Sequence, residues 1–303
     1  MKVFVTGGAG FIGSSLVGKL LEKGILVTIF DDFSNSSKEK IQPLLKKGAK
    51  LVRGDITDYE TLQKTLNGFD SVVHLAAKID VKESIVKPEL YHKVNVVGTK
   101  NILDVCTKNG IKNVIATSSA AVFGNPNKLP LTEDSDLLPT SPYGKTKVAM
   151  EDLLRDYSKN SDLNCISLRF FNVYGKGQTD AYAGVITKFM KKIKEKQPLV
   201  IFGDGSNTRD FISIYDTIES IFRALEHILD KKGNCYNIAT GKAVSIKELA
   251  TLMLQISGQN LEIRYEQPRQ GDILHSQTKI DLAKRELNFY SKIELCDGLK
   301  KLL

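Results

Sequence analysis

The N-terminal segment places the strongest limit on how this chain can fold: a short apolar strand, a glycine-rich turn and a helix. Residues 2–13 read Lys-Val-Phe-Val-Thr-Gly-Gly-Ala-Gly-Phe-Ile-Gly, and Leu16, Leu20 and Leu21 give the following helix an apolar side. Glycine permits positive φ in a tight turn and lets a ligand approach the backbone closely. Amides at a helix N-terminus attract an anion. This order of elements therefore predicts a dinucleotide pyrophosphate site.

The glycine spacing fits this prediction in two ways. Gly8, Gly10 and Gly13 satisfy the dinucleotide fingerprint, and Gly7, Gly10 and Gly13 satisfy a looser three-residue spacing. A bare glycine match is weak, but its position between a strand and a helix is the structural context that supports it.

A second apolar strand, residues 26–30, ends in Asp31 and Asp32. A carboxylate at this distance is expected to meet the adenosine ribose, and Asp31 would repel a 2′-phosphate, so NAD is favoured over NADP. The alternative is that both aspartates only cap a loop.

Strands and helices alternate through the first half of the chain. The apolar strand candidates are residues 3–5, 26–30, 50–53, 71–75, 114–117 and 165–168. Between them lie helical patterns, one begun by Asp58 as N-cap and long ones at 88–109 and 142–160. This alternation predicts an α/β fold with a Rossmann-type, doubly wound parallel sheet, whose ligand binds at the carboxyl ends of the strands.

After Phe170 the rhythm loosens, which predicts a smaller α/β substrate-binding lobe. We expect residues 1–169, with roughly 207–237, to form the NAD-binding domain. Residues 170–206 and 238–303 are expected to form the nucleotide-sugar lobe.

Composition excludes several other classes. The chain has 303 residues, 42% of them hydrophobic, and no apolar run approaches the ~20 residues that span a bilayer. We expect a cytoplasmic protein with no membrane partner. The four cysteines and four histidines lack metal-ligand spacing, so no metal is expected. The net charge of +8 comes from scattered lysines without aromatic interleaving, so we expect no nucleic-acid partner.

Tyr143 and Lys147 are four residues apart, which places them on one face of a helix. Ser141 and Pro142 are a suitable N-cap and first residue for that helix. A nearby ammonium favours the phenolate form of a tyrosine and lowers its pKa, which suits proton exchange with a sugar hydroxyl. Most such pairs on helices are solvated surface residues, so the pair gains meaning only from the other motifs.

Taken together, the motifs resemble the extended short-chain dehydrogenase/reductase family, and within it the UDP-glucose 4-epimerase-like nucleotide-sugar epimerases. The resemblance covers essentially the whole chain and keeps motif order. Its motifs are the turn at residues 7–13, Gly54-Asp55-Ile56, Asn95-x-x-Gly98-Thr99, Ser118-Ser119, Tyr143-x-x-x-Lys147, Arg169-x-x-Asn172-Val173-Tyr174-Gly175, Phe202-Gly203-Asp204-Gly205 leading to Arg209-Asp210-Phe211, and Arg269-x-Gly271-Asp272.

The resemblance implies three sets of site residues. The catalytic residues implied are Tyr143, Lys147 and Ser119. The NAD-binding residues implied are Gly7, Gly10, Phe11, Ile12, Gly13, Asp31, Asp32, Asp55, Ile56, Leu75, Ala76, Ala77, Asn95, Ser118, Tyr143 and Lys147. The residues implied for the UDP-sugar are Asn172, Val200, Phe202, Arg209, Arg269, Asp272 and Ser276.

The reaction implied is inversion at C4 of a UDP-hexose through a transient 4-keto sugar. Ala120 and Ala121 stand where dehydratases of this fold carry an acid and a base, which argues against a dehydratase. Ala121 and Phe123 also replace the Thr and Tyr of many epimerases, which leaves the sugar less certain than the reaction. UDP-glucuronate epimerisation remains open, and a non-catalytic dinucleotide sensor is a remote alternative.

Two further expectations rest on the family. Ser276 lies four residues after Asp272, where a bulky aromatic would exclude N-acetyl groups, so UDP-GlcNAc and UDP-GalNAc are candidate substrates. Relatives often form homodimers through two helices per subunit, here residues 89–108 and 143–159. Val94, Val97, Ile102 and Val105 could face either a second subunit or the sheet.

Overall fold

The computed structural model describes residues 1–178, 184–230, 233–268 and 273–303. Its largest element is a seven-stranded sheet in which every neighbouring pair is parallel. In spatial order the strands are β3 (Lys50–Arg53), β2 (Leu26–Asp31), β1 (Lys2–Thr6), β4 (Ser71–His74), β5 (Asn113–Ser119), β6 (Asn164–Phe170) and β10 (Cys235–Ile238). The strand order reverses direction between β1 and β4, which is the position where a doubly wound sheet opens a crevice.

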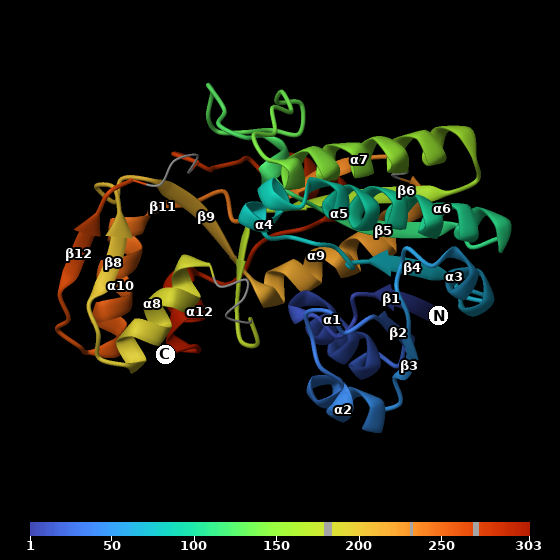
Figure 1. Ribbon diagram of the computed structural model, residues 1–303, viewed down its shortest axis with the longest axis horizontal. Helices are drawn as coiled ribbons and strands as arrows, with labels where there is room; N and C mark the ends of the chain where they lie inside the picture. Colours follow the sequence, from blue (N-terminus) through green and yellow to red (C-terminus); the bar gives the residue numbers. More distant parts are fainter. Residues whose placement is uncertain (179–183, 231–232, 269–272) are drawn as a thin grey trace.

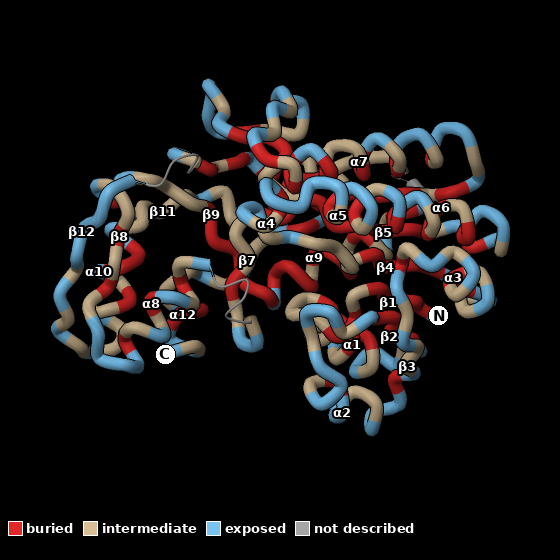
Figure 2. Tube along the Cα trace, viewed as in Figure 1, coloured by how far each residue is buried: buried red, intermediate tan, exposed pale blue. Residues whose placement is uncertain are grey.

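Helices cover both faces of this sheet (Figure 1). On one face lie α1 (Phe11–Glu22), α2 (Lys38–Lys46), α9 (Ile214–His227) and α11 (Asp281–Leu287). On the other face lie α3 (Tyr59–Thr65), α6 (Gly98–Lys108) and α7 (Pro142–Asn160). The predicted Rossmann-type fold is confirmed, and the buried residues concentrate between these layers (Figure 2).

The smaller lobe contains two short sheets. One has the order β11 (Ala243–Ser245), β9 (Thr208–Ser213) and β7 (Asn172–Tyr174), and the other pairs β12 (Ile263–Glu266) with β8 (Leu199–Phe202). Around a separate apolar core lie α8 (Val185–Lys194), α10 (Ile246–Ser257) and α12 (Leu295–Lys300). Phe171 alone separates β6 of the large sheet from β7 of the small one.

The helical pattern predicted over residues 88–109 is interrupted in the structure. A separate short helix, α4 (Val81–Val86), precedes this segment. The segment itself begins as α5 (Pro88–His92), continues as a π-helix, η1 (Lys93–Val97), and only then becomes α6. Ile102 and Val105 are fully buried against the sheet, whereas Val97 is 40% exposed. Two of the four apolar residues considered for a subunit contact therefore belong to the core.

Other local predictions are confirmed. Ser141 caps α7, accepting from the Gly144 amide at 3.1 Å, and Pro142 is the first helical residue. Asp58 caps α3. The described residues also contain the 3₁₀ turns η2 (Ala120–Val122) and η4 (Ile228–Asp230).

Candidate active site

A cavity of about 1050 Å³ lies at the carboxyl ends of the large-sheet strands and extends into the smaller lobe. Most of the residues predicted to bind NAD line it: Gly7, Gly10, Phe11, Ile12, Gly13, Asp31, Asp32, Asp55, Ile56, Leu75, Ala76, Ala77, Ser118, Tyr143 and Lys147. Ser119 and four of the predicted sugar-nucleotide residues, Asn172, Val200, Phe202 and Arg209, line the same cavity. One continuous space thus joins the two lobes.

The glycine turn forms a close backbone cradle at one end of this cavity. Gly7 has a φ of +66°, and a Cβ atom there would lie 2.7 Å from the Ala76 amide nitrogen. A Cβ atom at Gly13 would lie 2.1 Å from the Gly7 carbonyl oxygen. No side chain caps the N-terminus of α1 within the described residues, so its first-turn amides face the cavity end. These features fit a dinucleotide pyrophosphate.

The Asp31 carboxylate is held mainly by the protein itself. It accepts from the Ala9 amide at 2.9 Å, the Phe33 amide at 2.9 Å and the Ser36 hydroxyl at 3.0 Å, and the residue is 8% exposed. A carboxylate accepts about four hydrogen bonds, so Asp31 retains capacity for about one more. It therefore closes the turn and also faces the cavity.

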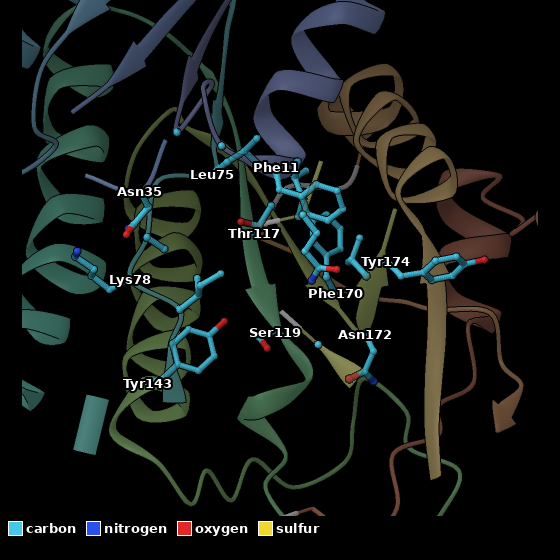
Figure 3. Close-up of a pocket in the computed structure, with 18 of the residues that line it drawn as sticks. Phe11, Asn35, Leu75, Lys78, Thr117, Ser119, Tyr143, Phe170, Asn172 and Tyr174 are labelled. Carbon is cyan, nitrogen blue, oxygen red and sulfur yellow. The ribbon is translucent and has the colours of Figure 1, made fainter. Parts of the chain in front are cut away.

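Tyr143, Ser119 and Lys147 meet where β5 ends and α7 begins. Tyr143 hydrogen-bonds Ser119, and both side chains point into the cavity (Figure 3). The Lys147 ammonium donates to the Thr117 carbonyl at 2.8 Å and lies 6.0 Å from the centroid of the Tyr143 ring. The structure thus brings the three predicted catalytic residues together.

One electrostatic expectation differs from the structure. Burial raises the pKa of Tyr143 above its usual value, while the hydrogen bond from Ser119 acts in the opposite direction. Burial also lowers the pKa of Lys147 to about 8, with Glu151 opposing the shift. The Lys147 ammonium is turned toward the Thr117 carbonyl. Burial therefore outweighs the effect of the Lys147 charge on the pKa of Tyr143.

His74, at the end of β4, orders the neighbouring turn. Thr99 donates to the Asn95 carbonyl at 2.6 Å, so its oxygen accepts from His74 Nε2 at 3.0 Å. His74 Nδ1 then accepts from the Thr6 hydroxyl at 2.7 Å. The Thr6 oxygen in turn accepts from the amides of residues 75 and 76, which line the cavity. Burial, with a smaller contribution from Lys147, lowers the pKa of His74 to about 3, so the ring is neutral.

Asn95 lies behind the cavity wall and is not one of its lining residues. It is 1% exposed and sits in η1, where its amide bonds both the N–H of Lys78 at 2.8 Å and the C=O of Lys78 at 2.9 Å. It also donates to Thr146 at 3.0 Å, whose hydroxyl donates to the Tyr143 carbonyl at 2.7 Å. π-Helical turns often occur at functional sites. Asn95 therefore connects the cavity wall to the catalytic helix.

The sugar-nucleotide end of the cavity depends on β9. Buried Asp210 accepts from Thr240 and Gly241 amides at 2.8 Å each, which fixes the strand that carries Arg209. The Asn172 amide donates to the Asp210 carbonyl at 3.2 Å. The Arg209 guanidinium donates to the Thr208 carbonyl at 2.8 Å and faces the cavity.

Of the residues predicted for the UDP-sugar, one lies off the cavity lining and two lie outside the described residues. Ser276 is 6% exposed, and its amide donates to the Thr208 carbonyl at 3.1 Å, so it lies beside β9 rather than on the lining. Arg269 and Asp272 lie outside the described residues.

Several lining residues were missed by the sequence analysis. Ser34, Asn35 and Ser36 follow β2 directly, and this polar run at a strand's carboxyl end was a usable signal. The other missed residues include Lys78, Thr117, Phe170, Gln178, Lys188 and Asn207. Thr117 and Phe170 lie near the ends of β5 and β6, and Lys188 lies in α8. Lys78, Gln178 and Asn207 lie in loops that no local pattern predicts.

Within the part of the chain that the structure describes, no cluster of three or more metal-ligating side chains occurs. In the same residues, no helix has the length and apolar character needed to cross a membrane.

A Rossmann-type sheet, a pyrophosphate cradle and a Tyr–Ser–Lys group define a dinucleotide-dependent enzyme of the short-chain dehydrogenase/reductase type. The sequence model of the NAD dependent epimerase/dehydratase family matches residues 3–239. The chain belongs to that family, and NAD is its cofactor.

Individual relatives cover nearly the whole chain. UDP-glucose 4-epimerase 2 of Arabidopsis thaliana is 34% identical over 327 residues, covering 98% of this chain and 93% of its own length. The structure of UDP-N-acetylglucosamine 4-epimerase from Methanobrevibacter ruminantium, in complex with UDP-N-acetylmuramic acid, has a TM-score of 0.94 at 32% identity and covers 99% and 96% of the two chains. UDP-glucose 4-epimerase from Thermotoga maritima, with UDP-glucose, has a TM-score of 0.93 at 33% identity with the same coverage.

Proposed function

We propose that this chain is an NAD-dependent 4-epimerase of UDP-hexoses, acting on UDP-glucose and UDP-galactose and also on UDP-GlcNAc and UDP-GalNAc. The observation that carries the proposal is the hydrogen-bonded Tyr143 and Ser119 pair beside Lys147, in a cavity shared by both lobes. Ala120 and Ala121 follow Ser119 directly, and neither can act as the acid or base of a dehydratase.

When bound, NAD would supply the hydride chemistry of the reaction, as the acceptor and then the donor of the hydrogen at C4 of the sugar. The glycine cradle and Ser118 are the residues that hold this cofactor. The Ser118 hydroxyl is buried at the cavity wall, and no hydrogen-bond partner for it exists among the described residues. A nicotinamide or ribose group gives it one.

Tyr143, in its phenolate form, accepts the proton of the C4 hydroxyl and later returns it. Ser119 bonds the phenol and so orients the proton that moves. Lys147, protonated below a pKa of about 8, keeps a positive charge next to the reacting groups. General acid–base transfer by a positioned side chain contributes about 10²–10⁴-fold to a rate.

The smaller lobe holds the UDP group while the 4-keto sugar rotates within the cavity. Arg209 suits the diphosphate because its planar fork donates two hydrogen bonds to phosphate oxygens. Asn172 begins β7, which pairs with β9, and its side-chain amide donates to the carbonyl of Asp210, the residue after Arg209. Val200 and Phe202 are assigned to the uracil. Arg269 and Asp272, outside the described residues, are assigned to the diphosphate and ribose.

We assign NAD binding to residues 1–169 with roughly 207–237, and sugar-nucleotide binding to 170–206 and 238–303. β10 lies in the large sheet, which supports this division. β9 lies in the small sheet and carries Arg209, so we place residues 208–213 with the sugar-nucleotide lobe.

The test is incubation of the purified protein with UDP-galactose, and separately with UDP-GalNAc, without added NAD. Formation of each C4 epimer, followed by proton NMR, supports the proposal and shows that NAD copurifies. Failure with both substrates, repeated with NAD and with NADP added, contradicts it. Turnover of UDP-glucuronate under those conditions favours the alternative sugar.

Ser276 tests the N-acetyl assignment. We expect Ser276→Tyr to lower turnover of UDP-GalNAc about tenfold or more relative to UDP-galactose, because a bulky ring beside β9 narrows the sugar end. Ser276→Ala is the control and should leave the ratio unchanged. A ratio that is the same in all three proteins contradicts the assignment.

A further inference from the structure

A buried ion pair lies directly behind the catalytic helix. Glu151 of α7 and Arg169 of β6 form two parallel hydrogen bonds, Nε to Oε1 at 2.9 Å and Nη2 to Oε2 at 2.8 Å. Their side chains are 1% and 3% exposed. The Cys235 thiol bonds the same carboxylate from β10. This pair is the most completely buried ion pair described in the molecule, and the reaction as proposed does not use it.

Arg169 has further contacts that fix it in one orientation. Its Nη1 donates to the Glu133 carbonyl at 3.1 Å, and its guanidinium lies 5.0 Å from the centroid of the Phe123 ring. In the sheet, Arg169 is the register partner of Ser118, at the end of β5 that forms the site. The ion pair thus joins α7 to the sheet at the level of the reacting groups.

Glu151 follows Lys147 by one helical turn, so the two side chains share a face of α7. Both are buried. An ion pair in this position needs an explanation other than stability, because apolar residues of similar volume often stabilise a fold equally well. Its placement one turn from Lys147 indicates a role in the site.

The charges around Lys147 identify that role. On its own helix it faces the phenol of Tyr143 and the carboxylate of Glu151. From β4 it faces neutral His74, and from β5 it contacts the Thr117 carbonyl. From the other side, Arg169, Glu133 and Cys235 surround Glu151. Glu151 is the carboxylate that opposes the effect of burial on Lys147.

We propose that Glu151, held by Arg169, is a positioning residue for the epimerase reaction: it fixes the turn of α7 that carries Lys147 and supplies the negative charge that keeps the ammonium protonated. The inference rests on the proposed function for its kinetic consequence alone. The protonation state of Lys147 can be measured without turnover.

The main test replaces the charge and keeps the shape. In Glu151→Gln, we expect the alkaline limb of the kcat–pH profile for UDP-galactose to move about one pH unit lower, because Lys147 loses its proton more readily. KM should change little. The Lys147 ammonium, followed by NMR in protein carrying ¹³C-labelled lysine and assigned by its absence from Lys147→Met, should lose its proton at lower pH in Glu151→Gln.

Three further proteins separate this effect from simple damage. Asp152→Asn breaks an exposed ion pair with Arg155 on the same helix and should leave both pH midpoints unchanged. Glu151→Asp retains the charge and should restore the wild-type limb. Glu151→Gln combined with Arg169→Met leaves neither member of the ion pair as an unpaired buried charge, so it provides the same comparison if the single variant does not fold.

If the pH midpoints of Glu151→Gln, or of the double variant, equal those of the wild-type protein, the inference is overturned. If the wild-type protein turns over no nucleotide sugar but the Lys147 midpoint still moves in Glu151→Gln, the proposed function fails and the inference stands. If turnover occurs and neither midpoint moves, the function stands and the inference fails.

Discussion

Two opposing influences act on the hydroxyl of Tyr143. Burial favours its neutral form, and the hydrogen bond from Ser119 favours the phenolate. The ring also lies edge-on to Tyr91, with centroids 6.5 Å apart, and the Tyr91 hydroxyl donates to Glu83 at 3.1 Å. The phenol is therefore held in place from both sides, as a proton carrier needs to be.

Removing this hydroxyl should remove the chemistry and leave the fold intact. We expect Tyr143→Phe to lower kcat by about 10²–10⁴-fold while NAD content and thermal stability stay near wild type. Coupled assays measure kcat, absorbance after denaturation measures NAD content, and thermal unfolding measures stability. Tyr157→Phe is the control on the same helix, where the hydroxyl contacts Asp104 away from the cavity. Loss of turnover in the control alone contradicts the assignment.

The burial of Lys147 leads us to expect that stability and turnover change in opposite directions as the pH rises. Its pKa is lowered to about 8 in the folded protein, so the folded state holds fewer protons than the unfolded chain above that pH. Its burial therefore destabilises the protein fully below about pH 8, and this cost disappears as pH rises to the unfolded pKa of about 10.4. Turnover should fall over the same range, because the ammonium is lost.

Denaturant unfolding of Lys147→Met checks the stability half of this prediction. We expect the variant to be more stable than wild type at pH 7 by up to roughly 3 kcal/mol, and the difference to shrink toward pH 10. Lys145→Met, at an exposed position of the same helix, should show no pH-dependent difference. A constant difference for Lys147→Met across this range contradicts the argument.

At the scale of elements, the start of α7 is fixed by a close backbone contact. A Cβ atom at Gly144 would lie 2.6 Å from the Ala121 carbonyl oxygen, so any side chain there displaces the turn that carries Tyr143. We expect Gly144→Ala to lower the free energy of unfolding by roughly 1–3 kcal/mol. It should also lower kcat, with a smaller change in KM. Chemical denaturation and steady-state kinetics measure these effects.

Gly18 is the matched helical control for this prediction. A Cβ atom there would meet only Leu44 Cδ2, at 3.6 Å, which is an ordinary contact. Gly18→Ala in α1 should therefore stabilise the protein by about 0.5–1 kcal/mol and leave kcat unchanged. Equal losses of turnover in both variants would show that the Gly144 contact is not special.

The elements were predictable from sequence where their causes are local. Apolar strands, the glycine turn and the Ser141 and Asp58 caps depend on residues a few positions apart. The π-helical turn at Asn95 was not predictable, because its cause is a pair of hydrogen bonds to Lys78, 17 residues earlier. The Glu151–Arg169 pair likewise depends on how α7 packs on β6.

At the scale of the whole molecule, we propose a homodimer formed through the helices of residues 89–108 and 143–159. Val97 is 40% exposed on this surface, whereas Ile102 and Val105 are in the core. We expect Val97→Glu to shift the protein toward monomer in sedimentation velocity experiments, because a buried unpaired charge opposes association. Leu229→Glu is the control, at a 70% exposed residue elsewhere, and it should leave the oligomeric state unchanged.

Sequence motifs predicted most of the NAD end of the site and less of the sugar-nucleotide end. The NAD residues follow strand ends of one sheet, so strand order alone brings them together. Asn207, Lys188 and Gln178 reach the cavity from separate loops and helices of the smaller lobe. Their meeting depends on long-range packing of that lobe, which leaves no periodic signal.

The passage between β6 and β7 limits how the length of this chain can vary. Phe170, Phe171 and Asn172 all line the cavity, and Phe171 is the whole connection between the two sheets. Side chains alternate along a strand, so one inserted or deleted codon here would exchange the two faces of β7. The exposed loop at residues 125–130 has no such constraint. Length variation can accumulate in that loop, while the passage between the sheets stays at a single residue.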